Sequence, residues 1–507
     1  MHGDEANQAY QFQMLWEDGT YRYEPRDFHG PTLYFMTLPW MKIAGADSFK
    51  NSEKGHFRSL PLVFSLLTAL CGLLMLDLLT KKGVLALTAM IMLSPSMIYY
   101  NTYYIQESLL VFGMTFFIAS LWRFYKSSKA FWLVSAGASL GFMHATKETF
   151  IISIFAILVA LLFTFGKSLS DLKAKIDAKH VAIFLLSAAF ISVVFYSSFF
   201  THARGPIDSV TSITNHIGRG LGIIDFPDHL TSGKGHAKSQ SYYLQNIIGH
   251  YPRKFTSTIK DIFSNNAARP ITEILFFILW MSSIFVWKKR GGTLAKSHRF
   301  FFWNTLIVLL VYSFIPYKTP WCAQVVVYSM IVAGSISLVR ILNSKSKALK
   351  WGASALFILL SFDLLRQGML ITEQGFSVSD RNQYAYSHAV LDVESLGDRI
   401  EEVSQISGQG YDMPVHFFTD EYWPMPWYLK KFNKVGYWES QQSQFPLSEV
   451  PVIVTTPDRE DIIEQLSETH QSELRSRIPG YWLRVFYRRD LWEKLLQSKA
   501  INQGDNI

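Results

Sequence analysis

The sequence is poor in charged residues and has almost no cysteine. Asp, Glu, Lys and Arg make up 17% of the 507 residues, against about 25% in an ordinary soluble chain. The two cysteines, Cys71 and Cys322, lie in or beside apolar segments, so a cysteine-based metal site is excluded and a structural disulfide is not expected. Internal repeats and low-complexity segments are also missing. The deficit of charge, together with 49% hydrophobic residues, places the chain among membrane proteins.

The positive net charge does not indicate a nucleic-acid partner. The formal charge is +8, but the lysines and arginines gather in short segments between apolar runs, which is the pattern of membrane topology signals. We therefore expect membrane lipids, and no nucleic acid, among the partners of this chain.

Ten apolar runs are long enough, at roughly 17–25 residues, to cross a bilayer as helices. The intervening stretch 31–45 is too short to span and is typical of a helix that lies at the membrane interface. The two runs on either side of Lys147 and Glu148 are short and are separated only by these two residues. The ten runs lie near 59–80, 83–100, 104–124, 130–146, 149–166, 180–200, 271–287, 300–316, 320–341 and 350–368.

The loops between these runs predict the orientation of the chain. If the amino-terminal segment lies outside, the alternate loops must be cytoplasmic, and each of them is rich in lysine or arginine, as the positive-inside rule requires. Segments 1–58 and 201–270 and the tail from 369 then share the outer face of the cell membrane. The chain begins Met1-His2-Gly3-Asp4, which leaves no room for a helix or signal before the first outer segment. We expect that a first transmembrane helix precedes this sequence in the full-length protein.

The tail differs in composition from the apolar runs. Short β-rich runs at 414–419 and 451–456, and a polar, helix-like stretch at 459–476, predict a small α/β domain. The expected fold is therefore a mostly α, polytopic membrane protein with about ten transmembrane helices and a small C-terminal α/β extracytoplasmic domain. Residues 1–368, with outer loops 1–58 and 201–270, form the transmembrane catalytic domain, and residues 369–507 form the extracytoplasmic domain.

Several ionisable residues are predicted at the outer membrane face. A charged side chain at membrane depth costs about 2.5–3.5 kcal/mol on insertion scales, so those that remain usually face a cavity. Plainer interpretations exist for each one: an interfacial carboxylate bonded to a tyrosine, a local ion pair in a loop, or a lysine that snorkels at a helix end. Their common location at one membrane face favours a functional site over a chance distribution of charged residues. The residues are Asp4, Glu5, Glu107, Lys147 and Lys318.

These residue types suit group transfer from a phosphate carrier. A carboxylate can take the proton of an attacking hydroxyl or amine, and neighbouring lysines can neutralise charge on a leaving phosphate. A second carboxylate or a histidine can hold a divalent ion for the same purpose. Tyrosines and a tryptophan near the same face (Tyr23, Tyr99, Tyr100, Tyr103, Tyr104 and Trp321) offer flat surfaces for sugars or isoprenoid chains, although such residues are also ordinary interface anchors.

Short stretches along nearly the whole chain resemble one family in order and spacing. These stretches are DEANQAY (4–10), YRYEPRDFHGPTLYF (21–35), YYIQESLL (103–110), TKETF (146–150), GKGHAKSQSYYL (233–244), YKTPW (317–321), RNQYAYSHAVLDV (381–393) and MPWYLKKF (425–432). With them the chain resembles GT-C glycosyltransferases of family 39, the protein-mannosyltransferase and aminoarabinose-transferase type. Within that family it is most similar to the flippase-activity-associated subfamily of archaeal N-glycosylation loci.

The resemblance implies that a sugar passes from a polyprenyl-phosphate-linked donor to a lipid, glycan or protein acceptor, with inversion at the anomeric carbon. Asp4 would be the catalytic base with Glu5 beside it, and Glu107 would orient the acceptor or a metal. The cofactor is left open, with a divalent metal ion as the candidate and Glu5, Glu107 and His236 as its candidate ligands. The residues expected to contact the donor phosphate or line the same cavity are His29, Lys147, Glu148, His236, Lys238 and Lys318.

Two other classes of function explain the sequence less well than a transferase does. A non-catalytic transporter or flippase-associated protein should show paired halves with broken helices near the membrane midplane, and the sequence has no such symmetry. A membrane-anchored sensor would leave Glu107 and Lys147 unexplained. The transferase is therefore the leading hypothesis, with the lipid-linked-glycan transporter as its alternative.

Overall fold

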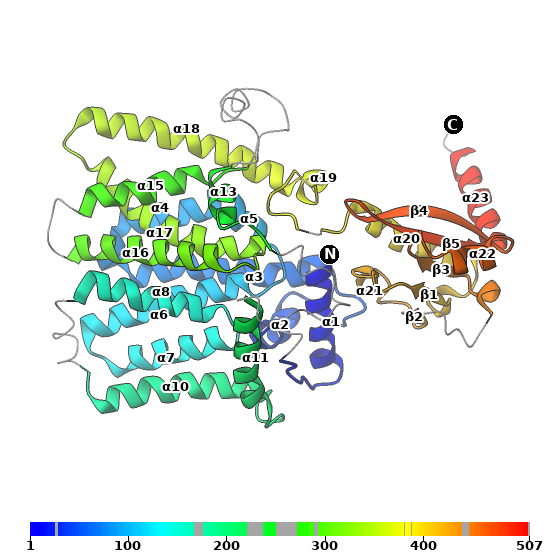
Figure 1. Cartoon of the computed structure of the whole chain (residues 1–507), viewed down its shortest axis with the longest axis horizontal. Coiled ribbons are helices and arrows are strands. Elements are labelled where there is room, and N and C mark those ends of the chain that lie inside the picture. The colour runs from blue at the N-terminus through cyan, green and yellow to red at the C-terminus, as the bar shows by residue number, and fades with distance from the viewer. Residues whose placement is uncertain are drawn as a thin grey trace.

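The computed structural model shows a long bundle of helices and, beyond one end of it, a smaller unit built on a β-sheet (Figure 1). The structure describes the chain except for residues 26–28, 167–175, 221–236, 250–270, 288–292, 380, 387, 439–445 and 505–507.

Every predicted apolar run contains a helix of the bundle, and these helices lie side by side and roughly parallel (Figure 1). The first run, predicted at 59–80, ends earlier as a helix, because α3 stops at Leu74 and α4 begins at Leu76. The second run was predicted as one helix, but it breaks at Ser94, which caps a new short helix that begins with Pro95. Proline cannot continue the preceding helix because it lacks the backbone N–H. The bundle comprises α3 (Lys54–Leu74), α4 (Leu76–Leu93), α5 (Pro95–Tyr100), α6 (Glu107–Ser127), α7 (Ala130–His144), α8 (Phe150–Phe165), α10 (Ala178–Tyr196), α15 (Ile274–Trp287), α16 (Thr293–Phe314), α17 (Ala323–Leu342) and α18 (Lys347–Thr372).

The protein is a multi-pass membrane protein. Within the described ranges, five helical segments are long and apolar enough to cross a membrane, and three shorter apolar helices accompany them. The count of ten spans therefore stays a prediction. The five segments are Lys54–Leu74, Glu107–Ser127, Ala178–Tyr196, Pro320–Leu342 and Lys347–Thr372.

Glycines allow two bundle helices to approach closely. A Cβ atom on Gly137 of α7 would lie 2.3 Å from the carbonyl oxygen of Phe184, and one on Gly141 would lie 2.3 Å from that of Ala188. Both carbonyls belong to α10. Small residues four apart on one helix face are a common means of close packing between membrane helices, and they hold α7 and α10 backbone to backbone.

Four short helices lie at the end of the bundle that faces the sheet unit, here called the α1 end. α1 and α11 run across the bundle direction there (Figure 1). The predicted interfacial stretch 31–45 is confirmed as a helix, α2, which buries Leu33, Tyr34 and Phe35. These helices are α1 (Gly3–Glu17), α2 (Thr32–Ile43), α11 (Gly205–Gly220) and α13 (Tyr242–Ile248).

The tail forms a five-stranded mixed sheet in the order β2-β1-β3-β5-β4. β1 is parallel to β2 and β3, while β5 is antiparallel to β3 and β4. The runs 414–419 and 451–456 are confirmed as strands β1 and β3. The strands are β1 (Val415–Phe418), β2 (Val435–Tyr437), β3 (Val452–Thr455), β4 (His470–Ile478) and β5 (Tyr481–Arg488), and the helices of this part of the chain are α19 (Gln374–Ser377), α20 (Leu391–Ile406), α21 (Met425–Tyr428), α22 (Glu460–Leu466) and α23 (Arg489–Gly504).

The helix-like interpretation of 459–476 is wrong in its second half. α22 ends at Leu466, and residues from His470 onward form β4. β4 lies at an edge of the sheet and pairs only with β5, and its side chains are mostly half-buried or exposed. Polar residues are tolerated at such an edge, so the local sequence lacks the apolar signal of a buried strand.

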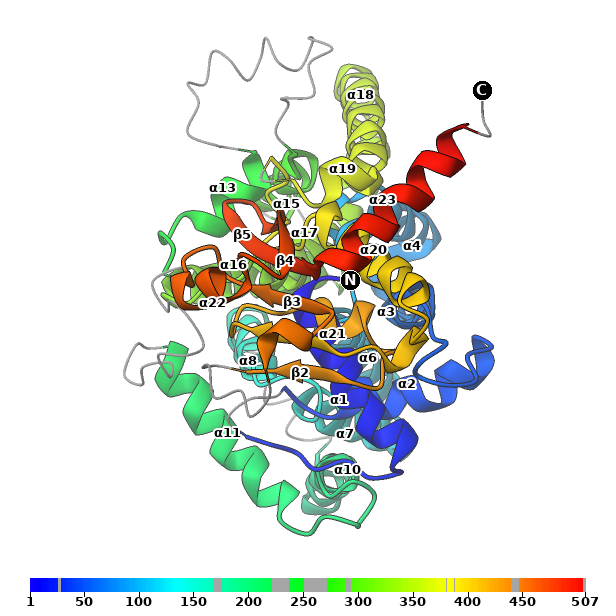
Figure 2. The same ribbon diagram turned by 90° about the vertical axis from the view of Figure 1, so that its right-hand side faces the viewer.

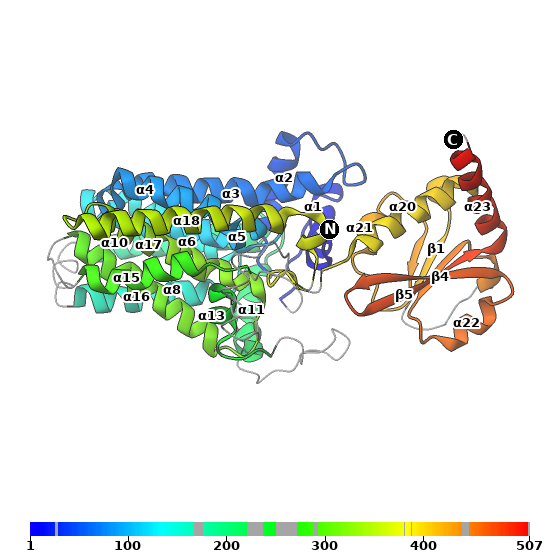
Figure 3. The same ribbon diagram turned by 90° about the horizontal axis from the view of Figure 1, so that it is seen from above.

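The sheet unit lies against the α1 end of the bundle. Seen along the bundle, the sheet and α20 lie in front of α1 (Figure 2), and seen from above, α1 and α2 lie on the side of the bundle nearest the unit (Figure 3). Trp427 of α21 is buried and packs edge-on against Phe49 and Phe57, at ring-centroid distances of 5.9 Å and 5.3 Å. The boundary predicted at 368/369 falls within α18, which continues to Thr372.

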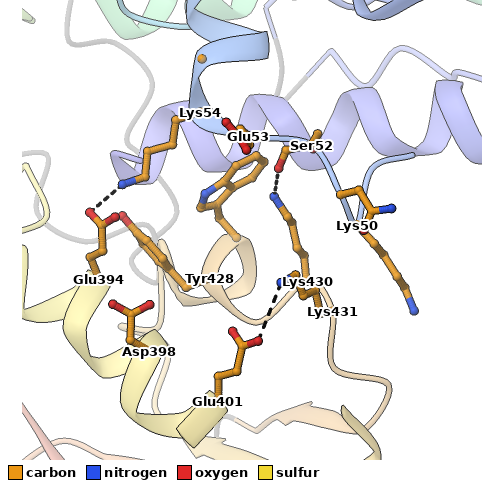
Figure 4. A pocket seen from close by; sticks show the side chains of 13 residues that line it. Lys50, Ser52, Glu53, Lys54, Glu394, Asp398, Glu401, Tyr428, Lys430 and Lys431 are labelled. Atoms are coloured by element: carbon orange, nitrogen blue, oxygen red, sulfur yellow. Dashed lines mark hydrogen bonds and ion pairs between the residues drawn. The ribbon is translucent and has the colours of Figure 1, made fainter. Parts of the chain in front are cut away.

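Polar contacts surround this tryptophan and line a cavity of about 580 Å³ between the two parts (Figure 4). Lys54 at the start of α3 pairs with Glu394 of α20 at 2.6 Å, and Lys430 donates to the carbonyl oxygen of Ser52. The ammonium of Lys430 also lies 3.5 Å from the ring centroid of Trp427. Because the charged pairs are partly exposed, they contribute little to stability, and the buried aromatic contact dominates the docking.

We therefore expect Trp427→Ala to loosen the sheet unit from the bundle. Loss of a buried tryptophan costs about 3–5 kcal/mol, here concentrated at the contact between the two parts. Limited proteolysis should cut the variant between α19 and α20 faster than the wild type. The matched control is Trp482→Ala, whose side chain on β5 is 51% exposed, and equal cutting of Trp427→Ala and the control would contradict the docking role.

Candidate functional site

Asp4 lies in the first turn of α1, at the α1 end of the bundle. His2 caps this helix, and its Nδ1 accepts a hydrogen bond from the backbone N–H of Asp4 at 3.1 Å. The Asp4 side chain is 51% exposed, and its Oδ2 lies 3.5 Å from His2 Nδ1. A helix N-terminus stabilises a carboxylate, so Asp4 presents a negative, solvent-accessible oxygen at this end of the bundle.

Glu5, predicted beside Asp4 as a catalytic residue, has a different environment. Its carboxylate is fully buried and accepts hydrogen bonds from Nε and Nη2 of Arg58, at 2.8 Å and 2.5 Å. Backbone N–H groups of His2 and Tyr104 also donate to it, each at 3.0 Å. Burial alone would raise the pKa of Glu5, but Arg58 outweighs burial and holds that pKa well below its usual range. Glu5 therefore orients α1 and Arg58, and it is poorly suited to accept a proton or to hold a metal.

Glu107 and Lys147 form a buried ion pair. Glu107 lies in the first turn of α6 and Lys147 in the turn between α7 and α8, and the two side chains are 2% and 5% exposed. The Lys147 ammonium donates to Oε1 of Glu107. Burial lowers the pKa of Lys147, but the charge and hydrogen bond of Glu107, with smaller contributions from neighbouring groups, raise it above its usual value. The other carboxylate oxygen, Oε2, is buried without a hydrogen-bond partner among the described residues. Glu107 is therefore an element of a buried charge pair, and not a surface carboxylate bonded to a tyrosine.

The His29-Gly30-Pro31 turn packs directly on the turn that carries Lys147. A Cβ atom on Gly30 would lie 2.1 Å from the carbonyl oxygen of Ala145, so only glycine fits there. Beyond it, Thr32 N–H donates to the same oxygen at 3.1 Å, and Thr32 Oγ1 donates to Thr146 Oγ1 at 2.8 Å. These contacts bring His29 Nδ1 to 2.9 Å from Oε2 of Glu148.

Gly30→Ala should separate these two turns. The added methyl group would meet backbone, which cannot rotate away, and overpacking of this kind costs about 1–3 kcal/mol. We expect a lower Tm for the purified variant in detergent. Gly55→Ala is the control, because a Cβ atom there meets nothing within 4 Å, and equal Tm values for the two variants would contradict the close approach.

His216 joins His29 and Glu148, although nothing in the sequence singled it out. Its Nε2 lies 3.8 Å from Oε2 of Glu148, and Ser212, one turn earlier on α11, donates through Oγ to Oε1 of Glu148 at 3.3 Å. Burial raises the pKa of Glu148, but the two histidines outweigh it and lower that pKa to about 2. The sequence around His216 gives no signal of this role, because only the fold places α11 beside the turn at 145–149.

Two of the three lysines predicted for the donor site, Lys238 and Lys318, lie side by side along the backbone but differ in exposure. Ala237 pairs with Tyr317 as an isolated bridge, which places Lys238 beside Lys318. The Lys318 side chain is buried, and its ammonium donates to the carbonyl oxygens of Ile315 and, at 3.5 Å, of Lys238. Lys238 is exposed. His236, predicted as a donor-phosphate or metal ligand, lies outside the described residues.

Aromatic side chains from the tail cover the N-terminus of α1. The His388 ring lies 4.1 Å from the His2 ring and 5.4 Å from the Tyr103 ring, measured between centroids, and Tyr103 Oη is hydrogen-bonded to His2 Nδ1. Burial, reinforced by His2, lowers the pKa of His388 well below its usual range. Tyr103 was among the predicted aromatic residues. His2 and His388 were missed, because their proximity arises only when residues 381–390 fold back onto α1.

Comparison with known proteins gives a match to one family model over part of the chain and a shared fold over nearly all of it. Residues 32–205 match the family model described as dolichyl-phosphate-mannose-protein mannosyltransferase. No curated protein sequence matches the chain. The crystal structure of ArnT from Cupriavidus metallidurans bound to undecaprenyl phosphate is 13% identical over 96% of this chain and 94% of that chain, with a TM-score of 0.60. The fold is that of ArnT.

Two further structures agree with the ArnT-like fold. ArnT in the apo state gives a TM-score of 0.61 at 13% identity, over 96% of this chain and 94% of that chain. The apo oligosaccharyltransferase from Archaeoglobus fulgidus gives 0.52 at 11% identity, over 90% of this chain and 66% of that chain. The match to ArnT includes the sheet unit, whereas the family model includes Glu107, Lys147 and Glu148 but neither Asp4 nor His29. The comparisons support a GT-C glycosyltransferase, and the flippase-associated subfamily stays a prediction.

Proposed function

We propose that this chain is a membrane glycosyltransferase that moves a sugar from a polyprenyl-phosphate-linked donor to a lipid, glycan or protein acceptor, with inversion, at the outer face of the cell membrane. One observation carries the proposal. A solvent-accessible carboxylate, Asp4, lies at the same bundle end as the buried Glu107–Lys147 pair, in a fold shared with ArnT bound to undecaprenyl phosphate.

Asp4 acts as the general base in this proposal. The acceptor oxygen or nitrogen attacks the anomeric carbon while its proton passes to the Asp4 carboxylate. The bond from the anomeric carbon to the phosphate oxygen breaks on the opposite side, and its electron pair leaves with the polyprenyl phosphate. Attack opposite the leaving group produces the inversion.

The leaving phosphate requires positive charge close to Asp4. Arg58 binds Glu5 through Nε and Nη2, and its side chain is 37% exposed, so its Nη1 is the donor that we assign to the phosphate. Exposed Lys238 is the second candidate. The phosphate contacts predicted for Lys147 and Lys318 stay predictions, since in this structure both ammonium groups donate to protein oxygens.

The sheet unit provides part of the wall beside Asp4. His388 and its neighbours reach the N-terminus of α1, as the 2.8 Å contact between His2 Nε2 and the carbonyl oxygen of Tyr386 illustrates. The rings of Tyr103 and His388 are themselves buried, at 3% and 6% exposure, and both pack on the His2 ring. We therefore assign to Tyr103 and His388 the positioning of the α1 N-terminus, which carries Asp4.

A transfer assay tests the function. Membranes that contain the protein are incubated with radiolabelled polyprenyl-phosphate sugars, and label is followed into lipid, glycan and protein fractions. Label that enters one of these fractions only when the protein is present supports the transferase. Label that crosses the membrane while it stays attached to its carrier would favour the alternative, a non-catalytic lipid-linked-glycan transporter or flippase-associated protein.

A further inference from the structure

Three side chains of the types that bind metal ions, from distant parts of the sequence, converge at the α1 end of the bundle. His29 comes from the turn before α2, Glu148 from the turn between α7 and α8, and His216 from α11. One ligand atom of each lies within 4.8 Å of the other two. Among the described residues, these three side chains are the His, Cys, Asp or Glu group whose ligand atoms are close enough together to share one metal ion.

We propose that His29, Glu148 and His216 bind one divalent transition-metal ion, with zinc as the best fit. The two imidazole nitrogens approach the same carboxylate oxygen, Oε2 of Glu148, at 2.9 Å for His29 Nδ1 and 3.8 Å for His216 Nε2. Zinc binds imidazole nitrogen and carboxylate oxygen at about 2.0–2.2 Å, so small side-chain movements would bring all three atoms to bonding distance.

Hydrogen bonds around His216 and Glu148 already orient these two ligands. Nδ1 of His216 lies 2.9 Å from the carbonyl oxygen of Ser212, which fixes the proton of the neutral ring on Nδ1 and gives the lone pair to Nε2, the atom nearer Glu148. Oγ of Ser212 lies 3.3 Å from Oε1 of Glu148. Such outer hydrogen bonds orient metal ligands and set the histidine tautomer.

The ligand types distinguish between classes of metal ion. Two imidazoles with one carboxylate suit zinc and its neighbours in the first transition row, whereas Mg²⁺ and Ca²⁺ prefer sites made of oxygen alone. The Glu148 side chain is 4% exposed, while those of His29 and His216 are 32% and 25% exposed. An ion can therefore enter from solvent between the histidines, and three protein ligands leave a fourth position for water or substrate.

A metal ion would also link three segments that are distant from one another in the sequence. Its three ligands would tie α11, the His29 turn and the end of α7 to one another. Neither of the two described metal candidates takes part, because Glu5 binds Arg58 and Glu107 binds Lys147; His236 lies outside the described residues. The inference rests on the geometry of this cluster, and it does not require the transferase reaction.

Metal content and binding test the site directly. Purified full-length protein is stripped with EDTA, titrated with Zn²⁺ in competition with a chromophoric chelator, and analysed for bound zinc by mass spectrometry. We expect one Zn²⁺ per chain in the wild type and at least tenfold weaker binding in His216→Ala and in Glu148→Gln. Zn²⁺ should raise the Tm of the wild type, because an ion that binds only the folded state stabilises it, and Mg²⁺ should not.

His180→Ala is the matched control, since His180 lies at the start of α10 and is bonded to Asp177, away from the cluster. It should bind zinc as the wild type does. If Glu148→Gln fails to fold, His216→Ala and His29→Ala, whose side chains are partly exposed, give the same comparison. Wild-type protein that takes up no zinc, or variants that bind it as tightly as the wild type, would overturn the proposal.

Discussion

Asp4→Asn should lower the rate of sugar transfer by about 10²- to 10⁴-fold, the usual contribution of a positioned general base. An amide matches the carboxylate in size but cannot accept the proton of the acceptor. The fold should survive, because the Asp4 side chain is half-exposed and makes one long contact, at 3.5 Å, with His2. Label transferred per minute and per amount of folded protein in membranes, compared with the wild type, measures the effect.

Two controls separate the base from its surroundings. Asp18→Asn removes an exposed carboxylate at the other end of α1 and should leave transfer unchanged. Glu5→Gln should instead lower the Tm, because it weakens hydrogen bonds to a charged group that are worth about 1.5–3 kcal/mol. Normal transfer by Asp4→Asn would remove Asp4 from the reaction and leave the base to be found elsewhere at the α1 end.

The helices were predictable because a membrane demands a local signal. A segment that crosses a bilayer needs a continuous apolar run of sufficient length, and each predicted run contains a helix. Their ends were less accurate: α6 begins at Glu107 and not at 104, and α16 begins at Thr293 and not at 300. Helix ends depend on caps and neighbouring segments, which hydropathy does not describe.

The candidate site was predictable only in part, for a similar reason. The topology rule placed Asp4, Glu107 and Lys147 at one end of the bundle, and the structure agrees. The pairing could not be predicted, because Lys147 and Glu148 are adjacent in sequence but turn to different partners, Glu107 and His29. His216 was missed because its partners come from residues 29 and 148, so no sequence spacing records the cluster.

The role of the Glu107–Lys147 pair can be resolved by a double substitution. Glu107→Gln leaves a buried ammonium without its counter-ion, and breaking a buried pair from one side costs about 3–5 kcal/mol. Lys147→Met leaves the carboxylate unpaired, with the same expectation. Both single variants should show a markedly lower Tm and a lower yield in detergent than the wild type.

Glu107→Gln combined with Lys147→Met removes both charges at nearly constant volume, so most of the lost stability should return, because neither partner is then left charged and unpaired. The rate of sugar transfer by the double variant then distinguishes a structural role of the pair from a role in the reaction. If the pair serves only packing, the stable double variant transfers label as the wild type does. We expect the double variant to be inactive, because it lacks the Glu107 carboxylate. Oε2 of that carboxylate is buried without a partner in the described part of the chain. An unpaired buried oxygen is costly unless a substrate or acceptor group uses it. Single variants as stable as the wild type would show instead that the pair is not buried in the working protein.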